Sequence, residues 1–146
     1  MPNESCRIMG RWFEEVWNRG RDETIDELLT ADAPLQGLGA ASETVIGTAG
    51  FREFHQRLRG AFSDIEIVIN EAIGEDDLAA LRWHARATHT GDELGIPPTN
   101  KKVIFTGMTF ARTRGGKVVE AWNNWDMMGL MHQLEQAPND AVVVRS

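Results

Sequence analysis

Apolar residues in the first part of the chain recur at the three- and four-residue spacing of amphipathic helices. Residues 5–18 carry one such stripe, which predicts a helix that ends near Gly20. Asp22 has the chemistry of an N-cap for a short second helix. A third helix is expected after Thr48, with phenylalanine and leucine on one face. Three helices are therefore expected before most of the strands.

The pattern changes to alternation of apolar and polar residues after Asp64, which is typical of β-strands. The strand-like segments are 65–70, 78–90, 102–112 and 117–126. Consecutive strands with short connections favour an antiparallel meander. Helices first and strands later indicate an α+β fold, with the helices on one face of a curved sheet.

The whole chain has the composition of one ordinary globular domain. It has 146 residues, of which 42% are hydrophobic and 25% charged, so a core with a pocket is expected. We expect a single domain over residues 1–134 and a C-terminal tail over 135–146. No apolar run predicts a membrane span, and no secretion signal is evident, so we expect a cytoplasmic protein.

Charge and chemistry-bearing residues narrow the function classes. The net charge of −7 argues against nucleic acid as a partner. Cys6 is the only cysteine, and His84 and His89 fall on opposite faces of one strand, so we expect no metal site. The chain has neither a glycine-rich phosphate loop nor a nucleophile elbow. What remains is acid/base chemistry without a cofactor.

The last strand carries the most informative pattern. Strict alternation would place Val118, Glu120, Trp122, Asn124 and Asp126 on one face. If that face lined an aromatic cavity, desolvation would raise the pKa of Asp126 and suit it to proton exchange near neutral pH. Alternatively, Asp126 is the N-cap of a helix that begins at the next residue. The pattern leaves both roles open.

His89 lies on the more apolar face of its strand, where alternation also places Trp83. It is either a proton relay or donor to a substrate carbonyl, or a hydrogen-bonded structural residue. Several large apolar residues are candidates for a cavity that accepts a flat ligand, although each could equally be plain core. They are Trp17, Phe51, Trp83, Phe105, Met108 and Trp122.

The run from Gly116 to Leu134, GKVVEAWNNWDMMGLMHQL, resembles the C-terminal signature of the SnoaL-like polyketide cyclases, also called ester cyclases. Further matching pieces are Trp17-Asn18 before Gly20, Arg82-Trp83 before Thr88-His89, and Gly95-Ile96-Pro97-Pro98-Thr99. Together these pieces extend over most of residues 12–134.

The resemblance implies the cone-shaped α+β fold of the ketosteroid isomerase and nuclear-transport-factor-like superfamily, the cystatin-like α+β barrel. In that fold a curved antiparallel or mixed sheet wraps around three N-terminal helices and encloses a deep pocket. It also implies a homo-oligomer, dimer or tetramer, formed through the sheet. No membrane partner is expected, because no apolar run is long enough to span a membrane. The implied reaction is a cofactor-free intramolecular aldol cyclisation of a polyketide-like carbonyl compound.

The resemblance also implies roles for particular residues. Asp126 would be the acid/base, and His89 and Asn124 would polarise or orient substrate oxygens. The expected substrate-binding residues are Trp17, Phe51, Trp83, Phe105, Met108, Glu120, Trp122 and Asn124.

Two other functions stay open on the sequence, because a fold shared by several activities does not fix a reaction. One is non-catalytic binding of a small hydrophobic molecule. The other is hydrolysis of an epoxide by a water molecule held in an Asp-Arg-Asp arrangement, to which Arg82 and Asp126 would contribute two members.

Overall fold

The computed structural model describes residues 3–39 and 43–135. The helices are α1 (Glu4–Arg11), the π-helical η1 (Trp12–Asn18) that continues it, α2 (Asp22–Leu28), α3 (Gly47–Ala61) and α4 (Met127–Glu135). The strands are β1 (Pro34–Gln36), β2 (Thr44–Ile46), β3 (Glu66–Glu75), β4 (Leu78–Thr88), β5 (Lys102–Arg114) and β6 (Lys117–Trp125).

The helices form where the apolar stripes predict them. The stripe of residues 5–18 is buried along α1 and η1. At α2 the expected cap is wrong by one residue, since Arg21 occupies the cap position and Asp22 is the first helical residue. There its carboxylate still lies at the positive end of the helix dipole.

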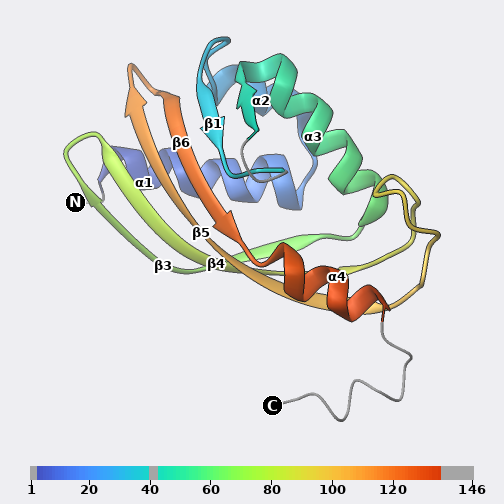
Figure 1. Cartoon of the computed structure of the whole chain (residues 1–146). Coiled ribbons are helices and arrows are strands. Elements are labelled where there is room, and N and C mark those ends of the chain that lie inside the picture. Colours follow the sequence, from blue (N-terminus) through green and yellow to red (C-terminus); the bar gives the residue numbers. More distant parts are fainter. Residues whose placement is uncertain (1–2, 40–42, 136–146) are drawn as a thin grey trace.

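The six strands form one open sheet in the order β2-β1-β6-β5-β4-β3. The antiparallel meander from β3 to β6 is confirmed. The sequence analysis missed β1 and β2, which are three residues each; β1 runs parallel to β6, so the sheet is mixed. Figure 1 shows the sheet curving around α1 and η1, with α3 across the open side. The α+β fold class is confirmed, although the sheet does not close into a barrel.

A β-bulge near the start of β6 decides which of its residues face the helices. Arg112 pairs with Glu120, but the next residue of β5, Thr113, pairs with Val118, so Val119 has no partner. An extra residue in one strand reverses the facing of everything beyond it. The prediction that Val118 shares a face with Glu120 is therefore wrong.

The described part of the chain ends in helix α4. Glu135 is the last residue of α4, so it does not belong to the predicted tail, and residues 136–146 lie outside the described part. Within the described residues, no helix has the length and apolar character needed to cross a membrane.

Candidate functional site: an aromatic cavity on the concave face

The concave face of the sheet and the helices that cover it enclose an aromatic cavity. Its wall includes four tryptophans and four phenylalanines, which are Trp12, Trp17, Trp83, Trp125, Phe13, Phe51, Phe54 and Phe105. Aliphatic side chains from α1, α3 and the strands complete most of the remaining surface. A ligand in this space would meet mainly rings and methyl groups, which favours a flat, apolar molecule.

The cavity is small in this conformation, with a volume of about 60 Å³. An engineered protein cavity that binds benzene has about 150 Å³. A ring-sized ligand therefore enters only if the wall moves. Trp125 is a half-buried part of this wall, and its Nε1–H donates to the Leu38 carbonyl (2.9 Å).

Two polar residues, Thr109 of β5 and Asn123 of β6, also line the cavity. The Trp83 indole donates to Thr109 Oγ1 (3.0 Å), and Thr109 donates to Asn123 Oδ1 (2.8 Å). Asn123 Nδ2 in turn donates to the Gln36 carbonyl of β1 (3.0 Å). Neither residue is among the ligand-binding residues expected from the sequence, which on the last strand were Glu120, Trp122 and Asn124 of the alternate face. Among the described wall residues, none carries a carboxylate, imidazole, amine or thiol group.

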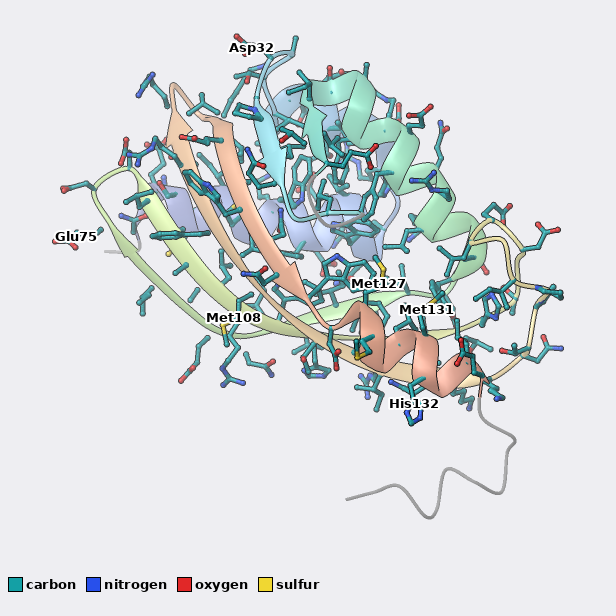
Figure 2. The ribbon with its side chains drawn as sticks, viewed as in Figure 1. Asp32, Glu75, Met108, Met127, Met131 and His132 are labelled. Carbon is teal, nitrogen blue, oxygen red and sulfur yellow. The ribbon has the colours of Figure 1, made fainter. Side chains whose placement is uncertain are left out.

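The expected ligand-binding residues divide between the two faces of the sheet. Trp17, Phe51, Trp83 and Phe105 lie in the cavity wall. The other four, Met108, Glu120, Trp122 and Asn124, do not line it. Figure 2 shows Met108 projecting away from the helices on the convex side, where 60% of its surface is exposed.

These four residues lie outside the aromatic cavity, and their expected role in ligand binding stays a prediction. Trp122 and Asn124 line a separate, more open hollow of about 800 Å³ on the convex face together with Met108. Glu120 lies near Arg112, with 3.6 Å between Oε1 and Nε. The bulge at Val119 turns the residues of β6, and Met108 alternates outward between the buried Gly107 and Thr109.

Asp126 caps α4 from outside the cavity. Its backbone N–H donates to the Thr106 carbonyl (2.9 Å), and its Oδ1 accepts from the Gly129 N–H (2.8 Å). A Cβ on Gly129 would collide with the Asp126 carboxylate, so a larger residue at this position would require the Asp126 side chain to move. The exposed side chain lines a hollow with Arg82 and Asn124. The capping role is thus observed, and the acid/base role stays a prediction.

His89 is fully buried but is not part of the cavity wall. Its Nδ1 accepts from the Thr99 N–H (3.2 Å), and Thr99 Oγ1 lies 3.0 Å from the same nitrogen. Because Nδ1 is an acceptor, the proton of the neutral ring is on Nε2, which has no partner among the described residues. Its ring packs on Phe62, with centroids 5.5 Å apart. His89 thereby holds together the two ends of the connection between β4 and β5.

His55 is the titratable group packed directly behind the aromatic wall. Its Nε2–H donates to the Val16 carbonyl (2.8 Å), and its ring lies against Phe51 and Trp17. Burial lowers the pKa of His55, so the ring is neutral near neutral pH. It adds no charge to the cavity.

The two residues expected in the epoxide-hydrolase arrangement, Arg82 and Asp126, lie together in one hollow outside the aromatic cavity. Arg82 pairs there with Glu71 (Nε to Oε1, 3.0 Å), and the arrangement itself stays a prediction. Over residues 3–39 and 43–135, no three His, Cys, Asp or Glu side chains gather closely enough to hold a metal ion.

Comparison with known proteins places this architecture in a family. The model of the SnoaL-like polyketide cyclases matches residues 7–134. The chain belongs to the SnoaL-like polyketide cyclase family. The resemblance drawn from the sequence is thus confirmed, and membership suggests a cyclase- or isomerase-type function. Among curated proteins no sequence matches the chain.

Solved structures share the fold over nearly the whole chain. A candidate SnoaL-like polyketide cyclase from Jannaschia sp. CCS1 is 21% identical, with a TM-score of 0.83 and coverage of 92% of this chain and 94% of that one. At this identity the likeness shows the fold alone. IdmH, a candidate polyketide cyclase from Streptomyces antibioticus, is 28% identical, with a TM-score of 0.78 and coverage of 92% and 100%. A candidate polyketide cyclase from Acidithiobacillus ferrooxidans is 25% identical, with a TM-score of 0.79 and coverage of 94% and 98%.

Proposed function

We propose that this chain takes up an apolar or aromatic carbonyl compound in its interior cavity and acts on it by cofactor-free acid/base chemistry of the cyclase or isomerase type. The observation that carries the proposal is the enclosed aromatic wall with a neutral polar pair, Thr109 and Asn123, set into it. Rings would hold a flat substrate by apolar contact, and the polar pair would orient its oxygen. Family membership supports the reaction type.

In the proposed aldol cyclisation, a base removes a proton from the carbon beside one carbonyl. The resulting enolate carbon attacks a second carbonyl carbon of the same molecule, which forms the ring bond, and the new alkoxide takes up the proton. Asp126 is the proposed base and proton donor. Its carboxylate lies outside the cavity, directly after Trp125 of the wall. The substrate must therefore extend past Trp125 toward the end of β6.

Asp126→Asn tests this role without removing the cap, because an asparagine oxygen also accepts from the Gly129 N–H. The measured quantity is exchange of the acidic carbon-bound protons of 2-tetralone, a flat apolar ketone, for deuterium from D₂O. We expect the wild-type chain to accelerate this exchange and Asp126→Asn to lose at least about 100-fold of the acceleration. Equal rates in the two proteins would show that Asp126 is not the acid/base.

A second function, binding without catalysis, is favoured by the absence of titratable side chains from the described part of the cavity wall. On that account Asp126 is only a helix cap. Saturable binding of the ketone with no accelerated exchange in the wild-type chain would support binding alone and contradict the enzymatic proposal.

The convex face supports a proposal about partners. It exposes Ile73, Ile104, Met108 and Phe110, which come from β3 and β5. Contiguous exposed apolar side chains mark interaction surfaces, so we propose that the chain forms a homo-oligomer through this face. Light scattering after size exclusion should give twice or four times the 16.3 kDa monomer mass. Phe110→Glu should shift the population toward the monomer, and a wild-type monomer at all concentrations would contradict the proposal.

A further inference from the structure

Asn123 belongs to a chain of hydrogen bonds whose donor-to-acceptor direction is fixed by the groups at its two ends. The indole N–H of Trp83 can only donate, and the backbone carbonyl of Gln36 can only accept. Thr109 therefore accepts from Trp83 and uses its own proton toward Asn123 Oδ1. The amide of Asn123 must then turn its Nδ2 toward Gln36. The orientation of this side chain is thus fixed by β4, β5 and β1 together.

This network leaves defined hydrogen-bonding capacity unused. The Asn123 amide has two N–H donors and uses one of them on Gln36. Thr109 has spent its only proton on Asn123. With respect to the described residues, Asn123 is accordingly the one of the two polar wall residues that keeps an unused donor. Trp12 and Trp17 add indole N–H groups that make no hydrogen bond to the described residues.

The neighbouring residue Asn124 has the same chemistry and the opposite placement. Its side chain is exposed in the hollow of the convex face, whereas Asn123 lines the cavity. The two asparagines therefore form a matched pair, in which only the position relative to the sheet differs.

We infer that Asn123 is the polar anchor of the cavity and selects neutral ligands that carry a carbonyl oxygen, which accepts the free Nδ2–H. This inference rests on the proposed function, namely that the cavity takes up an apolar ligand. Because no described wall residue carries a charge, an ionised ligand would be left without a counter-ion in an apolar site. A purely apolar ligand would leave the free N–H without a partner.

Acetophenone and α-methylstyrene test the inference, since the two molecules have the same shape and differ only in a carbonyl oxygen replaced by a methylene group. Dissociation constants are measured by NMR titration. We expect the wild-type chain to bind acetophenone about fivefold more tightly than α-methylstyrene, the ratio that one net hydrogen bond gives.

Three variants test whether Asn123 is the residue that causes the preference for acetophenone. Asn123→Leu should reduce the ratio to about one while α-methylstyrene still binds, because the apolar wall is kept. Asn123→Asp keeps the shape of the side chain and replaces the NH₂ donor by oxygen. It should also abolish the preference for acetophenone, and it replaces the leucine variant in the test if that variant does not fold. Asn124→Leu on the convex face should leave the ratio at its wild-type value.

The outcomes separate this inference from the proposed function. If the wild-type chain binds neither molecule, the proposed uptake of apolar carbonyl compounds in the cavity is wrong, and the inference about Asn123 is wrong as well. If both molecules bind, and Asn123→Leu or Asn123→Asp keeps the wild-type ratio, the cavity binds ligands but Asn123 is not the anchor.

Discussion

The concave and convex faces of the sheet differ most clearly along β6, where adjacent residues of similar chemistry have opposite surroundings. Asn123 and Trp125 line the aromatic cavity, whereas Trp122 and Asn124 lie in a more open hollow on the other side. The bulge at Val119 sets this division. Residue type alone therefore does not identify a site; one unpaired residue decides which member of each pair can meet a ligand.

The largest expected difference between the two faces is the loss of stability on truncation of a side chain. It can be measured at two adjacent residues of β5. Phe105 is buried against Trp83 and Trp125, whereas Thr106 is exposed on the convex side. Phe105→Ala should lower the free energy of unfolding by about 3–5 kcal/mol, because it leaves a cavity in the core. Thr106→Ala should change it by less than about 1 kcal/mol. Urea denaturation of both variants tests the contrast, and similar losses would contradict the assigned faces.

A smaller effect concerns the carboxylate of Asp126, whose observed contact is a helix cap. Asp126→Ala should lower the free energy of unfolding by about 1 kcal/mol, because the Gly129 N–H loses its acceptor. Asp126→Asn should lower the free energy of unfolding by only about 0.3 kcal/mol, since asparagine keeps the acceptor oxygen. Thermal unfolding of the two variants compares them. If Asp126→Asn lowered the free energy of unfolding by as much as Asp126→Ala, the stabilising feature would be the negative charge of Asp126 and not its hydrogen bond to Gly129.

Glu15 of η1 provides a carboxylate whose charge does matter for folding. Hydrogen bonds from Arg11 and Thr24 lower its pKa to about 2, and only 16% of its side chain is exposed. A carboxyl group with a lowered pKa in the folded state stabilises the fold above its ordinary pKa of about 4.5. This contribution disappears as the pH falls from about 4.5 to about 2.

The corresponding prediction is a pH-dependent effect of Glu15→Gln. We expect a loss of about 1 kcal/mol at pH 7, since solvent around the half-exposed Arg11 weakens the interaction. The difference between variant and wild type should narrow as the pH is lowered toward 2. Denaturation at a series of pH values measures it, and a constant difference would exclude a charge effect.

Much of the fold follows from the sequence because periodicity reports which positions are buried. The stripe in residues 5–18 and the alternation in β4 place the same residues in the core that the structure does. The strands β1 and β2 could not be read this way, because three residues show no period. Their pairing depends on distant residues, as between Leu35 and Ala121.

The site was harder to predict than the fold. The aromatic residues Trp17, Phe51, Trp83 and Phe105 belong to helices and strands with regular patterns, and all four lie in the wall. On β6 the alternation left open which face meets the cavity, and the expected residues Trp122 and Asn124 lie on the convex side. The bulge at Val119 leaves no signal in the sequence pattern. For Asp126, a cap and a cavity carboxylate occupy the same position in sequence, so the sequence could not separate the two roles.

The ligand is proposed to bind in the cavity on the concave face, and the five tryptophans allow this placement to be tested in one spectrum. Trp12, Trp17, Trp83 and Trp125 line the cavity, while Trp122 lies on the convex face. In a ¹H–¹⁵N titration with acetophenone, we predict that the four indole N–H signals of the wall shift with one common dissociation constant and that the Trp122 signal stays in place. A shift confined to Trp122, with the other four unchanged, would contradict the account.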